Sequence, residues 1–151
     1  MKTCCFTGHR NITEEQKRYA TDYIIKYIDN LIWQGYTHFI TGMADGADLL
    51  VAKVVLDFKS IDKEIFLEAA VPYRDRLKCK SIKFINILKY CDKVTVIQEK
   101  YDMSCFMKRN KYMVDNSDVV IAIWDGRKMG GTYNTIKYAE SQRKKVLLVI
   151  V

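Results

Sequence analysis

One stretch, SDVVIAIWDGRKMGGTYNTIKYA at residues 117–139, constrains the fold of this chain most strongly. It opens with an unbroken apolar run at residues 119–124. A run this short and rich in β-branched residues is typical of a strand that is buried on both faces of a parallel sheet. A polar, glycine-bearing loop follows at residues 125–132, and residues 133–143 have helical character. A strand, a glycine turn and a helix in this order leave free backbone N–H groups at a helix N-terminus, where an anion can bind.

The rest of the chain repeats this alternation. Strands are predicted at residues 2–7, 38–41, 65–71, 93–97, 119–124 and 146–151, with Pro72 ending the third. Helices are predicted after Thr13, where TEEQ has the form of a capping box, and at residues 47–58, 74–90, 104–116 and 133–143. The pattern predicts one α/β domain over residues 1–151. Its fold is expected to be Rossmann-like and doubly wound, with a mainly parallel sheet of about six strands and helices on both faces.

Composition excludes several classes of protein. Of the 151 residues, 49% are hydrophobic and only one is proline, which is typical of a globular chain rather than a disordered one. No apolar run approaches the roughly 18 residues of a membrane span, so we expect a soluble, cytoplasmic protein. Five cysteines form no CxxC pair, and His9 and His38 are the only histidines. We therefore predict free thiols in a reducing compartment, no metal site and no cofactor.

The formal net charge of +7 favours an anionic partner, either a phosphate-bearing small molecule or nucleic acid. The cations are spread along the sequence, however. The basic run at residues 143–145 lies at the end of the last predicted helix, where positive charge complements the helix dipole. We therefore favour a small anionic ligand and keep nucleic acid as an alternative.

Ligands of doubly wound sheets bind beyond the carboxyl ends of the strands, near the point where the strand order reverses. Three polar loops follow predicted strands and are expected to meet there. They are Gly8-His9-Arg10, the loop at residues 42–48, and the loop that begins with the turn Asp125-Gly126.

The loop at residues 42–48 reads GMADGAD. Gly42 and Gly46 allow a tight turn and the close approach of a ligand to backbone N–H groups, including that of Ala44. Asp45 or Asp48 is expected either to cap the following helix or to accept a ribose hydroxyl. A plain connection without a ligand is the alternative, since the sequence is neither a P-loop nor a GxGxxG motif.

The other loops supply donors for a phosphate. Gly130, Gly131 and Thr132 offer backbone N–H groups and a hydroxyl at a helix start, and Tyr133 is the candidate to stack on a base. A loop capped by Thr132 is the structural alternative.

Charged side chains lie near the same predicted edge. Arg10 can hold a phosphate with two hydrogen bonds, and His9 can bond a phosphate or act as an acid or base. Arg109 and Asn110 lie on the helix before the fifth strand, where a solvated arginine is the plain interpretation.

These motifs resemble a known superfamily. TGMADGAD at residues 41–48 resembles the SGxAxGID turn of the DNA-processing protein DprA (Smf). Residues 106–132 resemble the RKxxM…SDAFIALPGGxGT segment of the LOG proteins, which are cytokinin-nucleotide phosphoribohydrolases. Both belong to the SLOG superfamily. The start TGHR, the turn GMADGAD and the ending WDGxxxGGT together are most similar to its YpsA-like branch, over essentially the whole chain.

The resemblance implies a pocket for a nucleotide-derived ligand such as a mononucleotide, NAD or ADP-ribose, in a sensor or regulator that forms a homodimer. Arg109 stands where LOG enzymes have an arginine, and Asn110 replaces their lysine. The position of their catalytic glutamate falls on Lys137 or Tyr138, so no catalytic residue is carried over. Two alternatives remain open. One is an enzyme that cleaves the N-glycosidic bond of a nucleoside monophosphate with another carboxylate, and the other is a DprA-like binder of single-stranded DNA.

Overall fold

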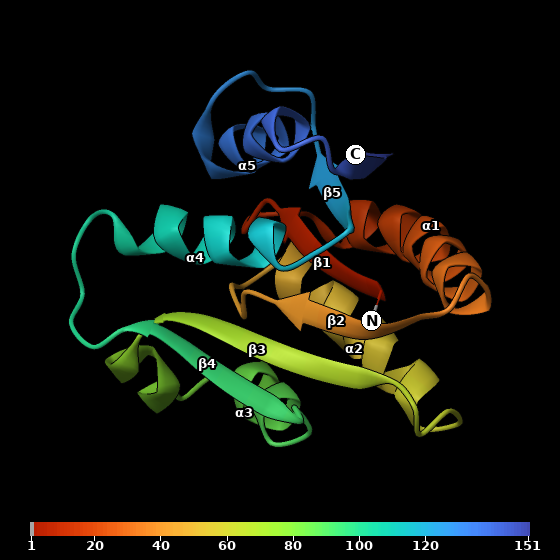
Figure 1. The fold of residues 1–151 in the computed structure, drawn as a ribbon, viewed down its shortest axis with the longest axis horizontal. Helices are drawn as coiled ribbons and strands as arrows, with labels where there is room; N and C mark the ends of the chain where they lie inside the picture. Colours follow the sequence, from red (N-terminus) through yellow and green to blue (C-terminus); the bar gives the residue numbers. More distant parts are fainter. Residues whose placement is uncertain (1) are drawn as a thin grey trace.

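The computed structural model describes residues 2–151 and contains a six-stranded sheet in which every pairing is parallel (Figure 1). The strand order is β4-β3-β2-β1-β5-β6. The strands are β1 (Lys2–Gly8), β2 (Tyr36–Thr41), β3 (Phe66–Tyr73), β4 (Lys93–Gln98), β5 (Val119–Trp124) and β6 (Lys145–Ile150). The predicted α/β, Rossmann-like architecture is confirmed.

Helices cover both faces of the sheet. They are α1 (Glu14–Trp33), α2 (Ala47–Lys59), α3 (Ile82–Leu88), α4 (Cys105–Asp115) and α5 (Gly130–Ser141), with a short 3₁₀ helix η1 (Arg74–Lys78). The larger buried cluster packs α1, α2 and α3 against one face, and a smaller cluster packs α4 and α5 against the other. The chain moves outward from β1 to β4 and then returns to place β5 beside β1. The strand order therefore reverses between β1 and β5, which is where such folds bind ligands.

Two predicted boundaries are wrong for local reasons. Pro72 lies inside β3 and does not end it. Its missing N–H breaks no pairing with β2, because that pairing ends at Ala69 while β3 continues beside β4. The helix predicted at residues 74–90 is two shorter helices, η1 and α3, because Ser81 accepts the backbone N–H of Phe84 and starts a new helix.

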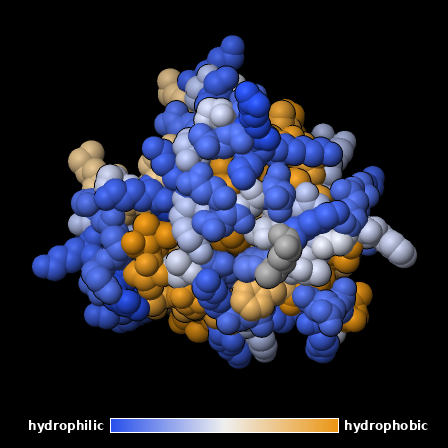
Figure 2. Space-filling view, viewed as in Figure 1, coloured by the Kyte–Doolittle hydropathy of each residue, from blue (hydrophilic) through white to orange (hydrophobic). Residues whose placement is uncertain are grey.

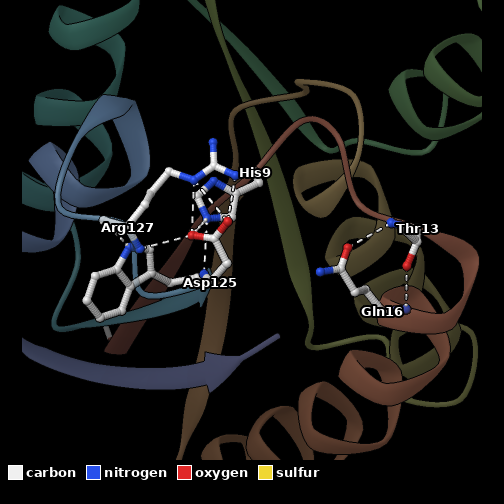
Figure 3. A network of polar contacts seen from close by, with 6 residues as sticks. His9, Thr13, Gln16, Asp125 and Arg127 are labelled. Carbon is white, nitrogen blue, oxygen red and sulfur yellow. Dashed lines mark hydrogen bonds and ion pairs between the residues drawn. The ribbon is translucent and has the colours of Figure 1, made fainter.

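The predicted last helix begins earlier than expected, at Gly130, so the glycine pair forms its first turn. Other local predictions hold. Thr13 and Gln16 make both hydrogen bonds of the predicted capping box at the start of α1, as Figure 3 shows. The five cysteines are free.

One face of the molecule is mostly polar at its surface. Figure 2 shows a largely hydrophilic face on which hydrophobic residues form separate patches. Within residues 2–151, no helix combines the length and the apolar character that a bilayer crossing requires.

Candidate functional site

The loops that follow β1 and β5 are joined by a polar network at the point of strand reversal (Figure 3). The Nε2 atom of His9 lies 3.1 Å from the backbone nitrogen of Asp125 and 3.1 Å from its carboxylate. A ring that carries its hydrogen on Nδ1 accepts the N–H at Nε2, whereas a ring with hydrogen on Nε2 donates to the carboxylate. Arg127 donates hydrogen bonds to both oxygens of the same carboxylate, and these bonds hold the pKa of Asp125 well below the usual range. Asp125 is thus already engaged within the protein.

The turn between β2 and α2 packs directly on the backbone that follows β1. The N–H of Ala47 donates to the carbonyl oxygen of His9 at 3.1 Å. Gly46 has a φ of +78°, and a Cβ there would lie 2.6 Å from the carbonyl oxygen of His9 and closer still to that of Arg10. The close approach that the glycine permits is therefore made by the protein's own backbone.

Asp48 and Arg109 form a buried centre beneath this turn. Asp48 is 5% exposed and accepts the backbone N–H of Ala44 at 3.2 Å, while Arg109 is also 5% exposed and donates to the carbonyl oxygen of Gly42 at 2.6 Å. Burial raises the pKa of Asp48 to about 6, against the opposing effect of the Arg109 charge. Burial likewise lowers the pKa of Arg109.

Two sequence interpretations are corrected by this centre. Helix α2 begins after Gly46 without any side-chain cap, so the prediction that Asp45 or Asp48 caps it is wrong. The Asp48 carboxylate instead accepts a hydrogen bond from the backbone N–H of Ala44, in the turn that precedes the helix. Arg109 is not a solvated arginine, because its side chain crosses to the turn after β2; its Nε also donates to Asn110 at 2.9 Å.

A small cavity of about 110 Å³ opens beside this centre, at the carboxyl ends of the strands. Three arginines line it: Arg10, Arg76 and Arg109. Arg10 lies over the ring of Phe106, 5.0 Å from its centroid, and Arg76 donates to the carbonyl oxygen of Met43 at 3.0 Å. The remaining lining residues are Ala44, Asp45, Pro72, Tyr73 and Phe106, so one carboxylate faces three guanidinium groups.

Sequence reasoning missed Arg76. Because one helix was predicted over residues 74–90, Arg76 was not counted among the loop residues that follow a strand. The available signal was its position four residues after Pro72, directly past the strand β3, where the chain again reaches the carboxyl edge.

The second predicted phosphate site is the N-terminus of α5. Its N-cap, Met129, makes no side-chain hydrogen bond, and Gly130 has a φ of +90°. A Cβ built at Gly130 or Gly131 would have no neighbouring atom within 4 Å, so this end of the helix is open to solvent. Thr132 does not cap the helix, as it lies inside the first turn and is 6% exposed.

Tyr133 stacks on Trp124, with ring centroids 6.2 Å apart. Trp124 in turn donates its indole N–H to the carbonyl oxygen of Arg127 at 2.8 Å, which fixes the turn containing Gly126. One face of Tyr133 is therefore occupied by the protein. The structure brings Arg10, Asp45 and Arg109 to one cavity and His9 to the Asp125 loop, while the ligand contacts of all these residues stay predictions.

Comparison with known proteins identifies a curated relative. The uncharacterized SPbeta prophage-derived protein YoqJ of Bacillus subtilis (strain 168) is 29% identical over 136 residues, which cover 79% of each chain.

Within residues 2–151, no group of three or more His, Cys, Asp or Glu side chains is placed to hold a metal ion.

Two solved structures share the fold. One is DNA processing protein A from Helicobacter pylori, described for its single-stranded DNA binding mode, with a TM-score of 0.70 and 18% identity. The match covers 97% of this chain and 64% of that one, so the present chain spans less than two thirds of its length. The other is TM1055, with a TM-score of 0.64 and 18% identity over 97% of this chain and 72% of that one.

The profile of a family described as the YspA SLOG family (YpsA) matches residues 4–150. This match includes all three glycine-bearing loops at the carboxyl edge of the sheet. The chain therefore belongs to the YspA SLOG family, as the similarity of its motifs to the YpsA-like branch indicated.

Proposed function

We propose that this protein binds a phosphate-bearing, nucleotide-derived ligand at the carboxyl edge of its sheet and acts as a sensor or regulator. The observation that carries the proposal is the cavity lined by Arg10, Arg76 and Arg109 with a single carboxylate, Asp45. Guanidinium groups recognise phosphate oxygens through paired hydrogen bonds, and a partly buried cluster of them attracts an anion strongly.

The size of the cavity indicates which part of a ligand it would hold. At about 110 Å³ it lies below the roughly 300–1,000 Å³ of pockets that enclose a whole small molecule. We infer that a phosphate group enters the cavity and that the rest of the ligand extends over the surface. The open N-terminus of α5 is a second place for negative charge, because its first N–H groups have no side-chain cap.

Binding without turnover is the activity we propose. At the place of the catalytic glutamate of LOG proteins, Lys137 pairs with Glu140 at 3.7 Å and Tyr138 donates to Asp115 at 2.6 Å. Neither side chain is a carboxylate that could replace that glutamate.

The test compares one arginine of the cavity with a matched control arginine outside it. Arg10 lines the cavity, whereas Arg74 begins η1 at the same edge, is exposed and pairs with Glu99 at 2.9 Å. Isothermal titration with AMP, ADP-ribose and NAD should show that Arg10→Ala weakens the ligand that binds by about 10- to 150-fold, which corresponds to the 1.5–3 kcal/mol of a hydrogen bond to a charged group. Arg74→Ala should stay within about twofold. Equal losses in both variants, or no binding of any of the three compounds, would count against this proposal.

A second candidate is binding of single-stranded DNA. The net charge of +7 and the structural similarity to DNA processing protein A favour it. An oligothymidylate whose affinity falls steeply with salt concentration, at submicromolar affinity near physiological salt, would support this candidate. Binding that is weaker than the nucleotide affinity and insensitive to salt would exclude it.

A further inference from the structure

A long groove follows the outer side of α2, on the face of the molecule that carries α1, α2 and α3. Helix α2 lies between α1 and α3 (Figure 1), and the groove has a volume of about 1,010 Å³. It is roughly ten times larger than the three-arginine cavity and is not needed for the proposed ligand. Arg10 and Asp45 line both spaces, so the groove begins beside the candidate ligand site.

One face of α2, with Ser60 directly after it, forms the floor of the groove. Leu49, Lys53, Leu56 and Ser60 line it at steps of three and four residues, which is the spacing of one helix face, and Leu50 beside them adds a third leucine. From Leu49 to Ser60 this face extends for about 16 Å, given the rise of 1.5 Å per residue. That length matches about three turns of a second helix laid along the groove.

The rim of the groove is basic. Among the lining residues that the structure describes, seven carry a Lys or Arg charge and three carry a carboxylate. Lys17 pairs with Glu14, and Lys59 pairs with Asp92. Within residues 2–151, no ion pair forms at Arg18 on α1, Lys53 on α2, or Lys63 and Lys83. The groove therefore has an apolar floor and unneutralised positive charge along both walls.

We propose that this groove docks an acidic amphipathic helix of a partner protein. Apolar side chains of the partner, three and four residues apart, pack on the half-buried Leu50 and Leu56, and its Glu or Asp side chains face Lys53 and the walls. This is the helix-in-groove mode of recognition, in which the apolar stripe supplies affinity and the charges supply orientation and speed of association.

The lining favours a peptide over nucleic acid. Proteins that bind single strands combine a basic groove with several aromatic platforms on which bases stack. The only aromatic side chain that lines this groove within the described residues is Tyr90, and the floor is aliphatic. Because Arg10 and Asp45 line both spaces, a helix docked here would lie beside a ligand in the arginine cavity.

The experiment selects binders from a displayed library of helical peptides against the folded wild-type chain. A double variant, Lys53→Glu with Lys83→Glu, reverses two exposed charges on the floor and one wall. Lys111→Glu is the matched control, because this exposed lysine lies on α4, on the opposite face of the sheet. Circular dichroism verifies that all three proteins are folded.

We expect enriched peptides to be net negative with apolar residues three and four apart. Their affinity should fall at least tenfold in the double variant and stay within twofold in the control, and amide shifts should change along α1, α2 and α3. Failure to enrich such peptides, or equal loss in the control, overturns the proposal. So does an oligothymidylate that binds this groove while no peptide is enriched, since the groove would then belong to nucleic acid.

Discussion

Replacing Gly46 with alanine should destabilise this protein far more than the same change at other glycines with positive φ. Gly46 has a φ of +78°, and an added Cβ would lie 2.6 Å from the carbonyl carbon of Arg10 and the carbonyl oxygen of His9. These are backbone atoms, so no side-chain rotation relieves the overlap. The loop after β1 would have to move away from α2, and the hydrogen bond from Ala47 to His9 lies in the same contact.

The magnitude follows from two separable costs. A backbone with positive φ alone costs a residue with a Cβ about 1–2 kcal/mol. Steric overpacking adds about 1–3 kcal/mol. Gly126 separates the two costs, because its φ is +93° and its added Cβ would have no neighbour within 4 Å. We therefore expect about 1–2 kcal/mol for Gly126→Ala and about 2–5 kcal/mol for Gly46→Ala. Gly131→Ala, in open space within the first turn of α5, should be neutral or stabilising by up to about 1 kcal/mol.

Urea unfolding followed by far-ultraviolet circular dichroism measures all three variants. The free energies of unfolding can be compared directly if the denaturant slopes agree with that of the wild type. If the losses for Gly46→Ala and Gly126→Ala differ by less than about 0.5 kcal/mol, the close packing of the two loops does not constrain the native state.

Three further predictions concern stability. Glu68→Gln should cost about 1.5–3 kcal/mol at pH 7, because His38 and Tyr112 hydrogen-bond its carboxylate at 2.8 and 2.6 Å. Burial alone would raise the pKa of Glu68, but the hydrogen bonds lower it to about 2. The stability advantage of the wild type over Glu68→Gln should therefore shrink as the pH falls from about 4.5 towards 2, and an advantage that is unchanged at pH 2 contradicts this prediction. Burial raises the pKa of Asp48 to about 6. The free energy of unfolding of the wild type relative to Asp48→Asn should therefore fall by up to about 3 kcal/mol as the pH rises from 4 through 6. A difference in stability that does not depend on pH would exclude a buried titrating carboxyl group. Thr13→Ala removes the capping box of α1 and should lower the free energy of unfolding by about 1 kcal/mol in the same urea assay, and no measurable change would mean that the cap does not stabilise the fold.

Local sequence determined much of the fold. The apolar run of β5, the capping box at Thr13 and the glycine-bearing loops after strands depend on residues within a few positions of one another, and each was predicted correctly. The alternation of strands and helices was then enough to predict a parallel sheet, since a parallel strand needs a crossover helix. Because such strands all end at the same edge, the sequence also predicted which loops meet there.

Only the tertiary structure decided what those loops do to one another. Arg109 reaches the carbonyl oxygen of Gly42 across 67 positions of sequence, and His9 contacts Asp125 across 116. Such contacts follow from how the helices pack on the sheet, which residue type and spacing do not encode. For the same reason, neither the part of Arg76 in the arginine cavity nor the basic groove beside α2 was predicted from the sequence. Burial, which excluded the alternative of a solvated Arg109, is a property of the packed chain rather than of any segment.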